Sequence, residues 1–242
     1  MPDIEIALIT DEAVSSELFD IVQSDDDLAG DFSSSNLTPE MSPFDQTLFL
    51  DTDTYLTADV SELFDVLNKH DLAVAPSPLS QDLVEGVPAP WTQFNTGVIA
   101  YRANEAVHKL FTRWNEIYQK WRVERNEVQN QPAFLKAVYE SNIDLFTLDP
   151  NYNTRLFCPG SLHGEAKIVH GRPAVGLKTA ARQINESSRF RAFFRNSFLS
   201  HRSAFKIVEG ASPRYHLEKS VMKRGLKKTI LDAPRYVKQR LL

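Results

Sequence analysis

The sequence predicts an α/β fold, a mixed but mostly parallel sheet flanked by helices, and three observations support that prediction. Short apolar runs of strand length alternate along the chain with segments whose apolar residues recur at helical spacing. Gly, Pro, Asn, Asp and Ser residues separate these segments, as expected for turns. The 242 residues include 42% hydrophobic and 24% charged residues, an ordinary composition for a globular chain.

Each expected element follows from its local pattern. The expected strands are apolar runs that end at polar or turn residues, and they lie at residues 4–10, 46–51, 71–77, 94–102, 143–149 and 166–173. The expected helices have apolar residues three or four apart, and they lie at residues 13–23, 60–70, 104–124 and 131–141. Pro132 falls in the first turn of the last helix, where proline is tolerated. The segments at 25–39 and 77–92 are expected to be loops.

Charge divides the chain unevenly. Residues 1–100 contain 20 Asp and Glu residues and one basic residue, Lys69, whereas residues 175–242 contain 16 Lys and Arg against four acidic residues. We place a domain boundary near position 175, between a first domain (1–175) and a basic, mainly helical C-terminal extension (176–242). The extension could pack on the first domain, or lie on an anionic membrane surface, where Phe and Leu among Lys and Arg suit an interfacial helix. It has no nucleic-acid-binding motif, so we expect no nucleic-acid partner.

The cellular setting follows from what the sequence contains. Cys158 is the single cysteine and cannot form an internal disulfide, which favours a reducing compartment. We find no run of about 18 or more apolar residues and no signal-peptide pattern at the N-terminus. We therefore expect a cytoplasmic protein, with peripheral contact at the inner membrane surface left open.

Two aspartates stand at the end of an apolar strand. Asp51 and Asp53 directly follow the run 46–50, and a buried carboxylate needs a partner. They could cap a turn, or they could hold a cation at the carboxyl edge of the sheet, where α/β folds bind ligands. Hard ions such as Mg²⁺ and Mn²⁺ prefer carboxylate oxygens, and a nitrogen ligand suits Mn²⁺. His170 also ends a short apolar strand and is the best-placed third ligand.

Four segments together carry a family resemblance. Residues 42–67 (SPFDQTLFLDTDTYLTADVSELFDVL), 94–102 (FNTGVIAYR), 130–134 (NQPAF) and 167–173 (KIVHGRP) resemble, in this order and at similar spacing, nucleotide-diphospho-sugar glycosyltransferases of the GT-A fold. The resemblance is closest to the Asp-x-Asp group that includes the glycogenin-like enzymes, and it covers roughly residues 4 to 173. It implies a hexosyltransferase-like enzyme that depends on Mn²⁺ or Mg²⁺. The donor would be a nucleoside-diphosphate sugar of the UDP or GDP type, and the acceptor a glycan, lipid or protein hydroxyl.

The resemblance also implies a metal and diphosphate site. Asp51 and Asp53, with Thr52 between them, would hold a divalent ion that bridges the diphosphate of the donor. His170 would complete the metal site. Arg172, just after that histidine, would neutralise phosphate charge.

A sugar site is implied beside the metal. Asn95 and Gly97 match a strand that lines the donor sugar, and glycine permits close approach there. Asn130 and Gln131 match a pair that faces the transferred sugar. From the residues alone, Asn95 could equally make a strand-end hydrogen bond, and Asn130 and Gln131 could simply cap the helix that starts at Pro132.

The chain departs from the family pattern at two points. Asn130 stands where the family usually has an aspartate, and the strand and helix that normally precede residues 4–10 are lacking, so we expect an N-terminally short domain. These departures favour one alternative, a catalytically weak or inactive homologue that binds a sugar nucleotide or glycan. A weaker alternative is a metal-dependent phosphohydrolase that uses the same two aspartates.

Overall fold

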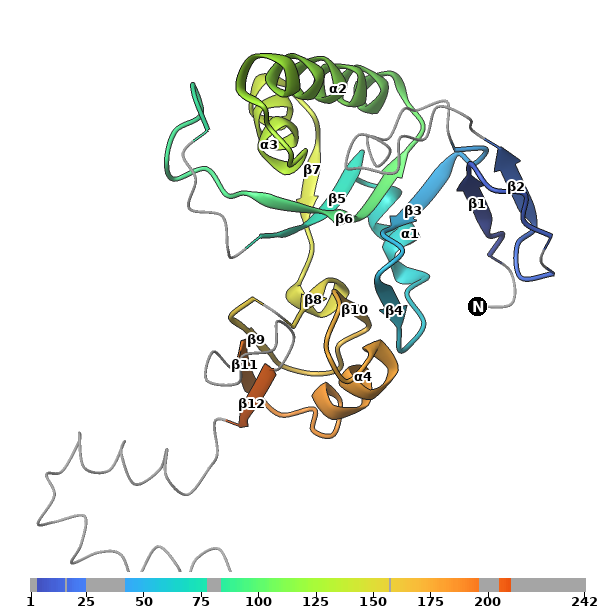
Figure 1. Ribbon diagram of the computed structural model, residues 1–242, viewed down its shortest axis with the longest axis vertical. Helices are drawn as coiled ribbons and strands as arrows, with labels where there is room; N and C mark the ends of the chain where they lie inside the picture. Colours follow the sequence, from blue (N-terminus) through green and yellow to red (C-terminus); the bar gives the residue numbers. More distant parts are fainter. Residues whose placement is uncertain are drawn as a thin grey trace, which may run out of the picture.

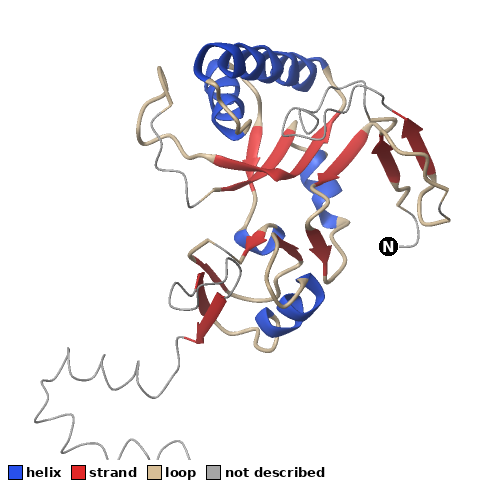
Figure 2. Cartoon of the chain, viewed as in Figure 1, coloured by secondary structure: helices blue, strands red, loops and turns tan. Residues whose placement is uncertain are grey.

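The computed structural model describes residues 4–15, 17–24, 42–77, 84–156, 158–195 and 205–209. These residues form a mixed α/β structure, in which helices pack on a central sheet and a second group of short strands lies beside it (Figures 1 and 2). The helices are α1 (Glu62–Leu67), α2 (Glu105–Arg125), α3 (Gln131–Glu140) and α4 (Leu177–Ile184), with a short 3-10 helix at Pro150–Tyr152. The α/β class expected from the alternation of elements is therefore correct.

The central sheet is mainly antiparallel. Its strands, in spatial order, are β3 (Gln46–Leu50), β6 (Phe94–Arg102), β5 (Leu72–Pro76) and β7 (Leu145–Thr147). Strand β6 is antiparallel to both β3 and β5, and β7 is parallel to β5. The expectation of a mostly parallel sheet is wrong for the described strands. Continuous apolar runs show that both faces of a strand are covered, but they do not fix its direction, and the described part of the β5–β6 connection, residues 84–93, contains no crossover helix.

Helices cover both faces of this sheet. Alternate residues of β6 point to opposite faces, so Ile99 and Tyr101 pack under α2 and α3, whereas Val98 and Ala100 pack against α1. Trp114 of α2 is fully buried in the first of these clusters. Packing on both faces thus constrains the strands and, with them, the turns at their ends.

A smaller sheet lies beside the end of β3. It contains β4 (Thr54–Leu56), β10 (Ile168–His170) and β8 (Thr154–Arg155), with β10 antiparallel to β4 and parallel to β8. A third sheet contains β9 (Gly160–Leu162), β11 (Arg191–Arg195) and β12 (Phe205–Glu209), all paired antiparallel. The turn between β3 and β4 therefore joins the central sheet to the small one (Figure 1).

The segment after position 175 contains strands where mainly helix was expected. Strands β11 and β12 lie there together with the helix α4. Phe193 of β11 and Ala181 of α4 share one apolar cluster with Leu162 and Val169, which precede position 175. The burial of Phe193 and the pairing with β9 outweigh the local helical pattern. The rest of the expected helical extension, residues 210–242, lies outside the described residues, and so do 25–41, so the proposed division into domains stays a prediction.

The expected helix at 13–23 is wrong for the residues described there. Strand β2 (Ile21–Ser24) pairs in parallel with β1 (Ala7–Thr10). The N–H groups of Asp20 and Ile21 contact the Ile6 carbonyl, and the Ile6 N–H donates to the Asp20 carboxylate at 2.7 Å. Pairing across the two strands thus satisfies the backbone groups that a helix would have used. No finding tests the expectation that a preceding strand is lacking.

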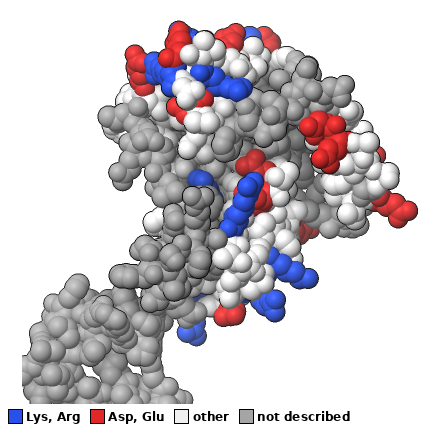
Figure 3. All heavy atoms as spheres, viewed as in Figure 1, with Lys and Arg blue, Asp and Glu red and all other residues white. Residues whose placement is uncertain are grey.

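Charged side chains gather at the end of the molecule formed by α2 and α3, where both signs are interspersed (Figure 3). Across the described segments, no helix combines the length and apolar composition that a bilayer crossing requires.

Candidate functional site

A tight turn carries the two aspartates of the Asp-x-Asp motif. The Asp51 N–H donates to the Gly97 carbonyl at 2.9 Å, which continues the β3–β6 ladder by one residue. The Thr54 N–H and hydroxyl both donate to the Asp51 carbonyl, at 3.1 and 2.8 Å. The chain thus bends between β3 and β4 and turns both carboxylates to the same side. Thr52, between them, is exposed.

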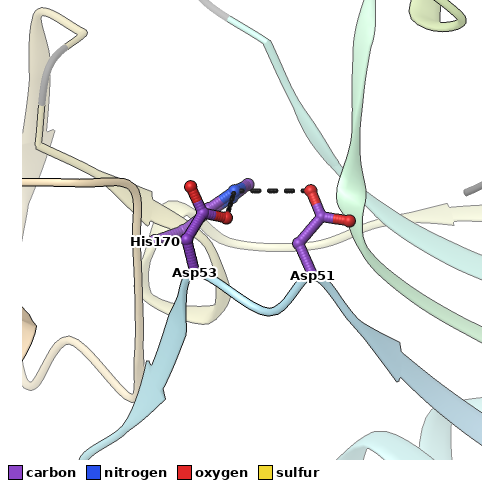
Figure 4. A group of neighbouring side chains, drawn as sticks. All are labelled: Asp51, Asp53 and His170. Atoms are coloured by element: carbon purple, nitrogen blue, oxygen red, sulfur yellow. Dashed lines mark ion pairs between the residues drawn. The ribbon is translucent and has the colours of Figure 1, made fainter. Parts of the chain in front are cut away.

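The small sheet brings His170 to this turn. In the β4–β10 pair, His170 lies opposite Thr54, and the Gly171 N–H donates to the Asp53 carbonyl at 2.8 Å. His170 Nε2 lies 3.2 Å from Asp53 Oδ1 and 3.6 Å from Asp51 Oδ2 (Figure 4). One ligand atom from each of the three residues lies within 4.8 Å of the others. The expected grouping of Asp51, Asp53 and His170 is therefore present.

Gly97 makes room for this cluster. A Cβ atom at this position would lie 2.2 Å from His170 Cε1 and 2.5 Å from Asp51 Oδ2, distances that real Cβ contacts do not show. Any larger residue would push the imidazole away from the carboxylates. Gly97 was expected to permit close approach of the donor sugar. In the structure, the groups that lie close to Gly97 are the side chains of His170 and Asp51.

The two carboxylates differ in their electrostatic environment. Burial raises the pKa of Asp51, and the nearby charge of Asp53 adds to this. The hydrogen bond with His170 lowers the pKa of Asp53, and this effect outweighs that of burial. The charge of Asp51 is therefore the unfavourable one in this partly desolvated place, and a bound cation would offset its cost.

Two arginines flank the aspartates. Arg172, 85% exposed, places Nε 3.3 Å from Asp53 Oδ2. Arg155, the residue opposite His170 in the β8–β10 pair, donates from Nη1 to the Ser77 hydroxyl at 3.1 Å. Its guanidinium charge acts on both Asp51 and Asp53. Residues opposite one another in a parallel pair point to the same face, so Arg155 and His170 share a face of the small sheet.

A row of side-chain amides extends inward from His170. His170 Nδ1 lies 2.9 Å from Asn153 Oδ1, and Asn153 Nδ2 donates to Asn95 Oδ1 at 2.7 Å. Asn95 Nδ2 donates to Gln131 Oε1 at 3.1 Å, and the Gly97 N–H donates to Asn95 Oδ1 at 3.3 Å. The expected sugar-side residues Asn95 and Gln131 are thus connected to the metal-side histidine, through Asn153.

Asn130 lies apart from this row. Its Oδ1 accepts from the Thr96 hydroxyl at 3.3 Å, and Thr96 points to the opposite face of β6 from Asn95 and Gly97. Its backbone carbonyl accepts from the Trp114 indole at 2.9 Å. Asn130 precedes α3 but makes no side-chain capping hydrogen bond, so the helix-cap interpretation fails for its side chain. Its assignment to the sugar site stays a prediction.

Sequence reasoning missed two residues of the site, Arg155 and Asn153. Neither residue is among those expected for the site from the sequence. Both lie in the polar run NYNTR, which follows the strand-like segment 143–149. The signal was available there, since polar residues directly after a buried strand can reach the same sheet edge as Asp51. Only the pairing of β8 with β10 shows that they do.

The cluster fits a hard divalent cation. Asp51, Asp53 and His170 supply two carboxylates and one imidazole nitrogen, a donor set that suits Mn²⁺ or Mg²⁺. Because Gly97 has no Cβ, the side chains of His170 and Asp51 can lie close enough together to share one ion. His170 is buried while both carboxylates are partly exposed, so the cluster opens to solvent on the carboxylate side.

The chain resembles several solved glycosyltransferases at low identity. Mouse xyloside xylosyltransferase 1 matches at 17% identity over 58% of this chain and 62% of that chain, with a TM-score of 0.40. The galactosyltransferase LgtC, in complex with donor and acceptor sugar analogs, matches at 17% over 64% and 66%, with a TM-score of 0.45. GlyE of Streptococcus pneumoniae matches at 22% over 49% and 28%, with a TM-score of 0.35.

This chain spans less than two thirds of the length of each of these three proteins. No protein-family model matches it, and no curated protein does. The resemblance to glycosyltransferases that the sequence predicts is thus also found among solved structures. Each TM-score is below 0.5, so the proposal below rests on the geometry of the site.

Proposed function

We propose that this chain is a divalent-metal-dependent glycosyltransferase of the GT-A type. It would take a sugar from a nucleoside-diphosphate sugar, of the UDP or GDP type, and pass it to a hydroxyl of a glycan, lipid or protein. The observation that carries the proposal is that Asp51, Asp53 and His170 converge at the end of a central strand. They can do so because residue 97 is a glycine, since a Cβ atom at that position would overlap His170 and Asp51.

The roles of the residues follow from their chemistry. Asp51, Asp53 and His170 would hold Mn²⁺ or Mg²⁺, and a bound divalent ion acts as a Lewis acid on the diphosphate leaving group. Asp51 and Asp53 balance the charge of a divalent ion, so Arg155 and Arg172 leave an excess of positive charge beside the cluster. A diphosphate diester carries two negative charges and matches that excess.

The amides would serve the sugar. Asn95 accepts from the Gly97 N–H and donates to Gln131, and amides exchange directed hydrogen bonds with hydroxyl groups. Their place beside a partly exposed metal cluster suits a sugar attached to the metal-bound diphosphate. Action in the cytoplasm and contact of the basic extension with a membrane surface are part of the proposal.

The test is calorimetric titration of the full chain with UDP and with GDP, in the presence of Mn²⁺ and then of EDTA. We expect one of the two nucleotides to bind with Mn²⁺ and to lose affinity with EDTA or in Asp53→Asn. Binding that is absent with Mn²⁺, or unchanged in Asp53→Asn, would contradict the proposal. Binding without hydrolysis or transfer of any UDP- or GDP-sugar would instead favour an inactive sugar-nucleotide-binding homologue. Release of inorganic phosphate would indicate a phosphohydrolase.

A further inference from the structure

The backbone N–H of Gly97 determines which way the amide side chains next to His170 are oriented, oxygen or amino group first. The Gly97 N–H can only donate, so the Asn95 atom that it contacts at 3.3 Å is the side-chain oxygen. Asn153 places a side-chain atom 2.7 Å from that same oxygen. Two acceptors would repel each other at this distance, so the Asn153 atom is the amino nitrogen. Its other terminal atom, the oxygen, then faces His170.

This direction fixes the protonation of the imidazole. The Asn153 oxygen lies 2.9 Å from His170 Nδ1, and an oxygen of a side-chain amide can only accept. Nδ1 must therefore carry a proton. Nε2, which lies 3.2 Å from Asp53 and 3.6 Å from Asp51, is then the ring nitrogen that faces the carboxylates. It donates to Asp53 while no ion is bound, and it is the nitrogen that a cation between the three residues would take as its ligand. A histidine ligand whose second nitrogen donates to a fixed acceptor is held in one tautomer and one orientation.

The same direction continues to Gln131. Because the oxygen of Asn95 faces Gly97 and Asn153, its amino group faces Gln131 at 3.1 Å, and the Gln131 atom there is the oxygen. Gln131 is therefore left with its amino group for whatever binds next to it. The partly exposed Gln131 is the outer end of the row, whereas Asn95 and Asn153 are 3% and 6% exposed.

We propose that Asn153 is the positioning residue of the site: its oxygen holds His170 with Nε2 toward the cation, and its amino group, through Asn95, turns Gln131 so that Gln131 donates to the substrate. This rests on the proposed function, because it assumes that His170 binds a metal ion and that a sugar nucleotide binds beside it. Asn153 would touch neither the ion nor the substrate. Its effect would be transmitted by hydrogen bonds alone.

Mn²⁺ titration of the full chain, followed by the electron paramagnetic resonance signal of free Mn²⁺, tests the role of Asn153 without a need for turnover. Asn153→Ala removes both hydrogen bonds and should weaken Mn²⁺ binding about 10- to 100-fold. Asn153→Asp combined with Asn95→Ala keeps an acceptor for Nδ1–H and removes the Asn95 oxygen that would repel the new carboxylate, so this double variant should stay within about threefold of Asn95→Ala. Asn142→Ala, in an exposed loop, is the matched control and should bind as the wild type does.

Asn95→Ala separates positioning from a general loss of structure. Asn95 is the more buried of the two, so damage to packing alone would make its substitution at least as harmful as that of Asn153. If Asn153 acts by positioning His170, Asn95→Ala should lose less Mn²⁺ affinity than Asn153→Ala, because Asn95 is connected to His170 through Asn153. An equal or larger loss of Mn²⁺ affinity in Asn95→Ala, or a loss in the Asn95→Ala, Asn153→Asp double variant as large as in Asn153→Ala, would overturn the proposal.

Gln131→Glu tests the outer end of the row. Glutamate can still accept from Asn95 but has no amino group. Mn²⁺ affinity should be unchanged, and affinity for UDP-glucose, or for GDP-mannose if GDP is the nucleotide bound, should fall about tenfold more than affinity for the bare nucleotide. An equal fall for both would overturn the proposed direction of the row. Failure of the wild-type chain to bind Mn²⁺ would overturn the metal site itself, and this outcome is distinct from all of those above.

Discussion

The α2–α3 surface and the Asp51–Asp53 turn are both charged, but their charges are arranged differently. On α2 and α3 opposite charges pair with one another: Arg113 contacts Glu116 and Glu140, and Lys136 also contacts Glu140. At the turn, two like charges stand side by side and share one histidine. The charges of the first region neutralise one another, whereas the two carboxylates of the second would be stabilised by an added cation. Convergent like charges on a rigid turn therefore indicate a binding site more strongly than charge density does.

The largest effect should follow from neutralising the turn. Asp51→Asn with Asp53→Asn should abolish Mn²⁺ binding, a loss greater than the roughly 100-fold that changes outside a ligand set can cause. Asp51→Asn alone should be more stable than the wild type in EDTA, by about 1 kcal/mol, because burial raises the pKa of Asp51 and its charge is unfavourable in the folded state. Mn²⁺ titration and urea unfolding measure the two quantities. An Asp51→Asn variant that is less stable in EDTA would show that the charge of Asp51 is not strained in the folded state.

Gly97→Ala should break the site without changing its charge. The added methyl group would overlap His170 and Asp51, which should cost about 1–3 kcal/mol of stability and about tenfold or more in Mn²⁺ affinity. Gly176→Ala is the matched control. The added Cβ there meets no atom within 4 Å, but the φ of +78° is unfavourable for alanine, so only stability should fall. Thermal unfolding in EDTA and Mn²⁺ titration separate the two effects.

The flanking arginines should affect the nucleotide and not the ion. Arg155→Met should weaken binding of UDP or GDP in saturating Mn²⁺ about tenfold, because Arg155 is half-buried beside the carboxylates. Arg172→Met, at an exposed position, should cost only about two- to threefold, and added salt should reduce this loss. Calorimetry at two salt concentrations measures both. A larger loss for Arg172 than for Arg155 would reverse these assignments.

The smallest effect should come from the paired surface. Burial alone would raise the pKa of Glu140, but hydrogen bonds from Lys136 and Arg113 outweigh it and lower the pKa. A lowered folded-state pKa gives stability that is present above the unfolded-state pKa and is lost as the pH falls through the folded-state value. Glu140→Gln should therefore cost up to about 1 kcal/mol at pH 7 and progressively less below about pH 4. Urea unfolding across this pH range measures the difference, and a cost that grows toward low pH would contradict the assignment.

The elements that local sequence determines could be predicted well. The helix expected at 104–124 is α2, where Asn104 caps the first turn by accepting from the Val107 N–H. The strand expected at 94–102 is β6, with the same bounds. The grouping of Asp51, Asp53 and His170 was expected from strand ends and family resemblance together.

What the sequence could not predict depends on pairing between distant segments. Strand direction in the central sheet is set by connections and not by the apolar runs themselves. Residues 21–24 pair with β1, and Phe193 packs against β9, so tertiary contacts override helical spacing in both places. Asn153 and Arg155 gain their importance only because β8 lies beside β10. No local pattern contains that information.

The pairing of β4 with β10 also has a consequence for the order of events in folding. It joins Asp53 to His170 across more than a hundred residues of chain, so closing this loop carries a large entropic cost and is expected late. A nascent chain would expose both aspartates well before the histidine emerges, and could hold Mn²⁺ only weakly until then. Tight uptake of the ion would therefore mark completed folding, and mass action would then favour the finished native state over every partly folded form.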